Sequence, residues 1–274
     1  MNNRTRILLG TCLLVGAIQL PAQVYTQGFE DPGWVPNTYP DWNEYSSTLT
    51  RVASGSITAA SGGYYAQVGP GLIEGGTDSG AFTRLGGYSS TWPGGFTTSL
   101  DIFIDLTDAG VAAGTYGFDL SSAANGQDAL HQRDFIFHVG ALNDGNVWLG
   151  ASNNSSFEIN SGALTTQIMS SGWYTFQTDF TDVGGILSVD LSVFDSGGST
   201  VFTTTRSSAE DIIATEVGGN RYMWFTYVDT VDGLAIDNAI LTAVPEPSTY
   251  ALLSFAALGL GLVIRRRLRS HKSD

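Results

Sequence analysis

Apolar and polar residues alternate along much of the chain with the two-residue period of a half-buried β-strand. Between residues 100 and 106, apolar residues at the even positions alternate with Asp101, Phe103 and Asp105. The segment 186–194 alternates in the same way, with serine and aspartate between its aliphatic residues. Related patterns predict further strands at 115–121, 133–139, 172–180, 200–206, 222–228 and 234–242.

Glycine, asparagine and aspartate separate these segments at the positions where tight turns are required. Such turns occur at 143–146, 182–185 and 195–198, so the strands 186–194 and 200–206 are predicted to form a hairpin. Only 208–217 has the character of a helical turn. Many short strands with Gly-rich turns are typical of an all-β chain. We expect one antiparallel β-sandwich, a jelly roll, over residues 23–243.

Composition and charge exclude several classes of protein. The 274 residues include 12 Lys and Arg against 26 Asp and Glu, a formal charge of −14, and 42% are hydrophobic. Residues 23–244 contain no Lys and carry a charge of −19, which argues against nucleic-acid binding. A single cysteine rules out both a disulfide scaffold and a cysteine metal site.

Residues 1–22 have the order of features found in a secretory signal peptide. Arg4 and Arg6 precede an apolar stretch at 7–20, and Ala22 provides a small residue for cleavage, with Ala17 as an alternative. This layout predicts export by the Sec machinery and removal of the segment by signal peptidase.

The C-terminal region consists of a proline-rich linker, an apolar stretch and an arginine cluster. Pro245 and Pro247 flank Glu246 and keep this segment extended. The apolar stretch 250–264 would span about 23 Å as a helix, against a hydrocarbon core of about 30 Å, so we expect it to insert with snorkelling arginines. The arginines place the tail 270–274 in the cytoplasm. They are Arg265, Arg266, Arg267 and Arg269.

Taken together, the features of residues 244–269 resemble the PEP-CTERM sorting signal of bacterial exported proteins. The resemblance implies recognition of Pro245, Glu246 and Pro247 by an exosortase, a membrane-embedded enzyme that cleaves near the motif. In that case these three residues perform no chemistry of their own. The implied course is anchoring in the inner membrane before processing, followed by release or display at the cell surface or in the extracellular matrix.

Two short segments also resemble the terminal strands of carbohydrate-binding jelly rolls: 28–31, with Trp34 nearby, and 235–238. The segment 173–176, followed by the predicted hairpin, is similar to concanavalin A-like sandwiches. In jelly rolls of this kind a cation ties the first strand to the last. The resemblance therefore implies a structural Ca²⁺ held by Glu30 and Asp237, and we expect no other cofactor.

Catalytic constellations are weak in this sequence. The segment 195–198 resembles a serine-protease nucleophile loop, but it lies at a hairpin turn, and no G-x-S-x-G elbow is present. His131 and His138 are too few ligands for a transition metal and are interpreted as hydrogen-bonded strand and loop residues. We expect no catalytic residues and no enzyme.

A polysaccharide-active glycosidase or lyase is the alternative. It would need two suitably placed carboxylates, such as the pairs Asp101 and Asp105 or Asp179 and Asp190. The E-x-D-x-x-E strand pattern of lectin-like glucanases is absent.

Aromatic residues in loop-like stretches suggest sugar stacking. Four of them lie in segments rich in Gly, Pro and Ser, whereas Trp148, Trp173 and Trp224 lie in strand patterns and are expected in the core. We therefore expect an exported, non-catalytic sandwich that binds carbohydrate, with exopolysaccharide as its partner. The four stacking candidates are Trp42, Tyr45, Tyr88 and Trp92.

Overall fold

The computed structural model describes residues 23–38, 41–69, 80–85, 91–125, 131–153, 163–218 and 223–243. All of them belong to one compact unit. The predicted signal peptide, the sorting motif, the arginine cluster and Tyr88 lie outside these residues. Among the segments described, no helix is long and apolar enough to cross a bilayer, and the apolar stretch 250–264 lies beyond them.

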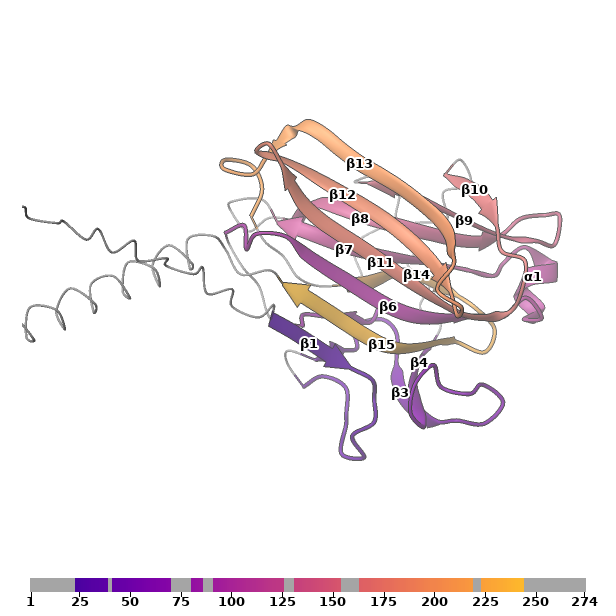
Figure 1. The fold of residues 1–274 in the computed structure, drawn as a ribbon. Coiled ribbons are helices and arrows are strands. Elements are labelled where there is room, and N and C mark those ends of the chain that lie inside the picture. Colours follow the sequence, from indigo (N-terminus) through magenta and orange to yellow (C-terminus); the bar gives the residue numbers. More distant parts are fainter. Residues whose placement is uncertain are drawn as a thin grey trace, which may run out of the picture. The chain divides into compact units, whose positions relative to one another are not determined.

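The described residues form two antiparallel sheets, which Figure 1 shows as two layers (Figure 1). Sheet A has the order β13-β12-β11-β6-β15-β4-β3, and β1 also pairs with β15. Its strands are β1 (Gln23–Gln27), β3 (Leu49–Ala53), β4 (Tyr64–Val68), β6 (Phe96–Ile104), β11 (Gly172–Val183), β12 (Ile186–Asp195), β13 (Thr200–Ile212) and β15 (Leu234–Ala243).

Sheet B has the order β10-β9-β8-β7-β14-β5-β2. Its strands are β2 (Trp42–Asn43), β5 (Phe82–Thr83), β7 (Gly117–Asn125), β8 (His131–Ala141), β9 (Val147–Asn153), β10 (Leu164–Gln167) and β14 (Met223–Asp229).

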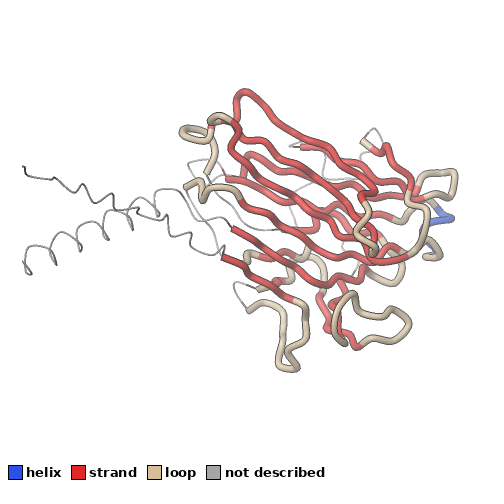
Figure 2. Tube along the Cα trace, viewed as in Figure 1, coloured by secondary structure: helices blue, strands red, loops and turns tan. Residues whose placement is uncertain are grey.

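The predicted all-β antiparallel sandwich is confirmed, and strand dominates the tube in Figure 2 (Figure 2). The predicted hairpin is also confirmed, because β12 pairs with β13, and 195–198 is its turn, in which Gly198 N donates to Asp195 O. The helical turn expected at 208–217 is confirmed only in its second half, where Thr215 N and Glu216 N donate to Ile212 O. Its first half is wrong, because residues 208–212 continue β13, whose pairing with β12 reaches Ile186 opposite Ile212.

The one helix among the described residues, α1 (Ala109–Ala113), was not anticipated. Asp108 caps its first turn by accepting a hydrogen bond from Gly110 N at 2.7 Å. Gly114 ends the helix in the left-handed conformation, with φ of 71°, which glycine adopts without a steric penalty.

The core lies between the two sheets and is rich in phenylalanine. Phe176 of β11 makes edge contacts with Phe118 of β7 and Phe137 of β8, at centroid distances of 5.7 and 5.2 Å. Phe180 stacks on Phe96 of the same sheet at 4.3 Å and meets Phe135 of β8 at 5.5 Å. These rings join sheet A to sheet B, and their burial is the main contribution to stability that we identify.

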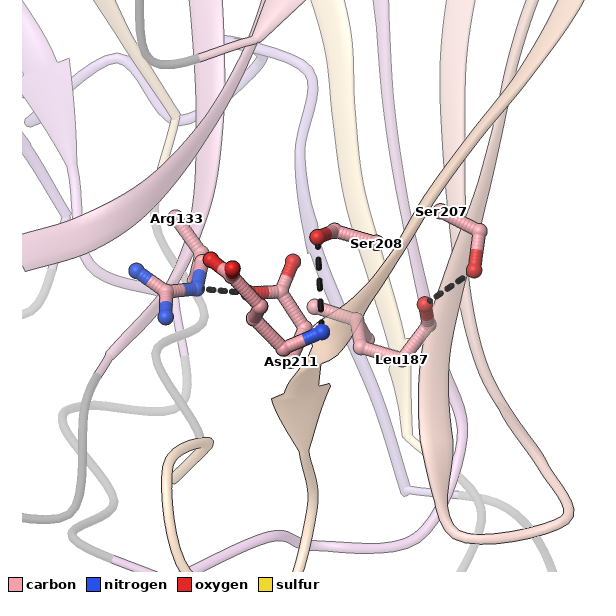
Figure 3. Close-up of polar contacts among 6 residues, drawn as sticks. Arg133, Leu187, Ser207, Ser208 and Asp211 are labelled. Atoms are coloured by element: carbon pink, nitrogen blue, oxygen red, sulfur yellow. Dashed lines mark hydrogen bonds and ion pairs between the residues drawn. The ribbon is translucent and has the colours of Figure 1, made fainter.

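An ion pair joins β13, the edge strand of sheet A, to β8 of sheet B (Figure 3). Arg133 Nε of β8 contacts Asp211 Oδ1 of β13. Burial raises the pKa of Asp211, while the neighbouring guanidinium opposes that rise. Figure 3 also shows Ser207 Oγ donating to Leu187 O at 3.0 Å, which adds a side-chain bond between β13 and β12.

Candidate functional site

A break in the pairing of β15 places several polar residues at one point of sheet A. β15 pairs with β4 through residues 234–236 and with β1 through residues 239–243. Asp237 and Asn238 lie where the neighbouring strand changes, and the register with β6 also shifts there. Asn238 has φ of 46°, a left-handed conformation that asparagine tolerates better than most residues.

Asp237 is fully buried at this break. Its carboxylate accepts hydrogen bonds from Ser61 N at 3.0 Å and from Asn238 N at 2.7 Å. Burial raises the pKa of Asp237 to about 6, and the negative charges of Asp101 and Glu30 contribute to the rise. The two backbone hydrogen bonds oppose the rise without cancelling it.

Glu30 reaches the same region from the segment that follows β1. Its Oε1 accepts hydrogen bonds from Gly63 N and Tyr64 N, each at 3.0 Å. Gly62 lies directly beneath this carboxylate with φ of 60°, and any side chain at Gly62 would collide with it. Arg51 donates to the carbonyl of Glu30 at 3.1 Å and so helps to hold the segment in place.

Asp101 of β6 lies opposite Asp237 in the register and completes the group. Its Oδ2 accepts a hydrogen bond from Asn238 Nδ2 at 2.8 Å, and its Oδ1 accepts one from Thr175 Oγ1 at 2.5 Å. We call Glu30, Asp101, Asp237 and Asn238 the junction cluster.

The junction cluster contains both residues that the sequence suggested as calcium ligands, together with a third carboxylate. In the part of the chain that the structure describes, no three His, Cys, Asp or Glu side chains are grouped closely enough to hold a metal by themselves. A cation here would therefore also need amide or carbonyl oxygens, which are ligands that Ca²⁺ accepts.

A second polar group lies on the outer face of sheet B. Asp119 of β7 is directly opposite His138 of β8. Ser152 of β9 is opposite Ile136 and therefore lies diagonally across from His138. His138 Nδ1 is 2.7 Å from Asp119 Oδ1, and His138 Nε2 is 2.7 Å from Ser152 Oγ. Asp119 and His138 are fully buried, and Ser152 is 7% exposed.

Two further side chains of β7 share this face. Ser121 and Asn125 alternate with core residues such as Leu120, so they point away from the core. Asn125 is fully buried, as is Ser121, and among the described residues neither side chain has a hydrogen-bond partner. Leaving a buried polar group unpaired costs about 1–3 kcal/mol. We call Asp119, Ser121, Asn125, His138 and Ser152 the polar face of sheet B.

The interpretation of His138 as a hydrogen-bonded strand residue is confirmed, but its partners were not anticipated. The alternation in β7 already placed Asp119 on the face opposite Phe118 and Leu120. What the sequence could not supply was the register that brings Asp119 and Ser152 to the same histidine.

The carboxylate pairs considered for a glycosidase have different surroundings. Asp179 and Asp190 are opposite each other on β11 and β12 and accept hydrogen bonds from Thr97 and Thr205, both at 2.5 Å. Asp101 belongs to the junction cluster, whereas Asp105 caps the turn after β6 by accepting from Thr107 N at 2.8 Å.

The aromatic stacking candidates differ in exposure. The expectation that Trp42 is accessible is wrong: its ring is fully buried and lies 6.1 Å from Phe225, because β2 turns it into the core. Tyr45 is 65% exposed, so its role in stacking stays a prediction. Trp92 is half-buried and lies 5.8 Å from Phe96, and its sugar contact is likewise untested.

The tryptophans expected in the core do not lie between the sheets, although Trp224 is buried as expected. Trp173 packs against Tyr65 and Phe103 outside sheet A, and its Nε1 donates to Thr58 O at 2.7 Å. Trp224 is buried with Ala123 outside sheet B. Loop and edge segments cover parts of both outer faces, so strand membership alone does not place an indole in the core.

The raised pKa of Asp237 predicts a pH dependence of stability. Below the unfolded pKa of about 4, protonated Asp237 makes its full contribution to stability, and this contribution is lost as pH rises through about 6. In calcium-free buffer, the unfolding free energy should therefore decrease between pH 4 and pH 7 by about 1–2 kcal/mol less in D237N than in wild type.

Urea denaturation across this pH range measures the effect. Asp134 also titrates near 6 because it is buried, but it is present in both proteins and its contribution cancels. The exposed Asp232 provides a control, since D232N should behave like the wild type. Parallel pH curves for wild type and D237N would contradict the assignment.

Comparison with known proteins gives several solved structures of similar fold and one sequence motif. Solved structures similar to this chain include a protein of unknown function from Shewanella oneidensis MR-1 (10% identity, 82% of this chain and 88% of that chain, TM-score 0.42). Lectin I from Ulex europaeus is another (12% identity, 82% and 99%, TM-score 0.40). An endo-1,3-β-glucanase from Streptomyces sioyaensis is a third (9% identity, 83% and 96%, TM-score 0.41).

At these identities and TM-scores the likeness concerns the fold alone, and nothing about ligand or activity follows from it. No curated protein sequence matches the chain. Residues 243–267 match the PEP-CTERM protein-sorting motif, which confirms the resemblance seen in the sequence. The chain therefore carries a PEP-CTERM sorting signal, which marks it for export and exosortase processing.

Proposed function

We propose that the protein is displayed outside the cell and that its β-sandwich binds carbohydrate on the polar face of sheet B. The sorting signal supports the location. The observation that carries the binding proposal is the pair of buried side chains, Ser121 and Asn125, that have no hydrogen-bond partner among the described residues. A ligand that supplies the missing hydrogen bonds explains why such groups are retained.

Carbohydrate has the chemistry that this face requires. A sugar hydroxyl both donates and accepts hydrogen bonds, as the serine hydroxyl and the asparagine amide need. Trp148 alternates with core residues of β9 and presents a half-buried indole ring on the same side of the sheet, where a pyranose can stack. The charge of −19 on residues 23–244 disfavours anionic polysaccharides, so the proposed ligand is a neutral glycan. Binding of this kind requires no catalysis.

The binding site can be tested with side-chain variants and a glycan panel. N125A should weaken binding of a neutral glycan about 10-fold, and S121A by a similar factor, because each removes hydrogen bonds worth about 1–3 kcal/mol. Calorimetry with the full chain measures the affinity. The exposed Asn143 offers a matched control, N143A, which should bind like the wild type.

Two outcomes would count against the proposal. Loss of binding in Y45A with N125A unaffected would move the site to the loop around Tyr45. Absence of binding to every neutral and anionic glycan in the panel would remove carbohydrate as the ligand. Release of new reducing ends from the host's exopolysaccharide would instead favour the glycosidase or lyase alternative.

Processing of the C-terminus is the second part of the proposal. We propose that exosortase cleaves near Pro245–Pro247 and leaves the sandwich at the cell surface or in the matrix. Mass spectrometry of the protein recovered from its host should show a chain that ends near this motif. In a host without exosortase, the chain should extend to Asp274. A chain that still ends at Asp274 with the exosortase intact would contradict the proposal.

We further propose a structural Ca²⁺ at the junction cluster. The supporting observation is the buried carboxylate of Asp237 next to the charges of Asp101 and Glu30, an arrangement that a divalent cation would stabilise. Glu30 and Asp237 are the ligands proposed, and the Asn238 side-chain oxygen and nearby backbone carbonyls could complete the set. A bound cation would tie the segment after β1 to β15.

Thermal melts with and without calcium test this site. Wild type should melt several degrees higher in millimolar Ca²⁺ than in chelator, because binding to the folded state alone stabilises it. D237N should lose this difference, while D232N should keep it. Equal melting temperatures for wild type at every Ca²⁺ concentration would exclude the site.

A further inference from the structure

Three residues on the polar face of sheet B are connected in the order that activates a serine nucleophile. Asp119 Oδ1 lies 2.7 Å from His138 Nδ1, and His138 Nε2 lies 2.7 Å from Ser152 Oγ. A carboxylate that accepts the Nδ1 proton holds the imidazole in one tautomer. In that tautomer the Nε2 lone pair faces the serine hydroxyl, which is the arrangement of a nucleophile, a base and an orienting acid.

The sheet itself positions this group. The three residues come from neighbouring strands, and backbone pairing sets Asp119 opposite His138 and Ser152 opposite Ile136. Such a scaffold holds side chains more rigidly than loops do. Ser152 is also the only one of the three with any exposure, at 7%. Ser152 is therefore the most accessible member of the group.

The surroundings strengthen the hydrogen bonds of this group. Asp119 and His138 are fully buried, where a low effective dielectric strengthens their interaction. The group faces away from the phenylalanine core, on the same face as Ser121 and Asn125. The group therefore lies on the proposed binding face rather than between the sheets.

We propose that Ser152, His138 and Asp119 cleave carboxylic esters. Ser152 Oγ attacks the ester carbonyl carbon and forms a new C–O bond, while its proton passes to His138 Nε2. The ester C–O bond then breaks, and the same proton passes to the departing alkoxide, which leaves as an alcohol. Water, activated by His138, hydrolyses the acyl-serine to a carboxylic acid and restores the hydroxyl. Asp119 acts as a positioning residue.

The substrate class follows in two steps. That the substrate is an ester rests on the triad alone. That the alcohol part of this ester is a sugar rests on the proposed carbohydrate binding. Among the described residues we identify no pair of donors arranged as an oxyanion hole, and one such donor contributes about 10²–10³ in rate. Turnover should therefore be slow and most easily detected with an activated ester.

A fluorophosphonate probe, which reacts covalently with activated serines, tests the triad in the full chain. Wild type should form an adduct on Ser152, located by peptide mass spectrometry, and should hydrolyse p-nitrophenyl acetate. S152A should show no adduct and at least about 100-fold slower hydrolysis. The control is S192A: Ser192 is also a buried strand serine, hydrogen-bonded to Thr203 at 3.0 Å, and the variant should react like the wild type.

D119N distinguishes a positioning role from a structural one. D119N should lower the rate of Ser152 labelling at least about 100-fold and change its pH profile, even where melting shows the variant to be folded. A purely structural network would give melting-temperature losses in S152A and D119N without any adduct in wild type.

The outcomes separate this inference from the proposed function. Absence of an adduct on Ser152 in folded wild type, or hydrolysis that survives S152A, overturns the triad. Labelling of Ser152 together with hydrolysis of p-nitrophenyl acetate supports it, whether or not glycans bind. Release of acetate from an acetylated neutral glycan, lost in both S152A and N125A, would connect the two sites. The same experiment tests the sequence-based expectation that the protein is not an enzyme.

Discussion

The two-residue alternation of β-strands is the constraint on which the rest of this structure depends. Every second side chain of the paired strands enters the phenylalanine-rich layer between the sheets, where Phe96, Phe135 and Phe180 meet. A polar group in that layer loses its hydrogen bonds to water and needs a partner there, as the buried hydroxyls of Thr98 and Ser122 have at 3.0 Å. The two larger polar groups described above lie on the outer faces, one outside each sheet.

The two outer sites arise from different local features. The junction cluster exists because β15 exchanges β4 for β1 as its neighbour, which interrupts the ladder at Asp237. The polar face of sheet B needs no interruption, since uninterrupted pairing of β7, β8 and β9 aligns its residues. At the junction cluster, burial is the largest cause of the raised pKa of Asp237, ahead of the neighbouring charges.

Sequence reasoning worked where the signal was local and periodic. The strands around Leu100 and Val189 were predicted within a few residues, because alternation and turn chemistry are local properties. It failed at 208–212, where pairing with β12 extends the strand and delays the expected turn. It also failed for Trp42, since a loop-like composition does not reveal that a two-residue strand turns the ring inward.

The sequence by itself determined the sorting signal, the all-β class and the pairing of Glu30 with Asp237 as candidate ligands. These depend on short motifs, on periodicity and on a resemblance carried by a few adjacent residues. Only the tertiary structure decided that Asp101 joins that pair and that His138 contacts both Asp119 and Ser152. The physical reason is register: a shift of one residue moves every side chain of a strand to the opposite face, and no local pattern specifies which partner it meets.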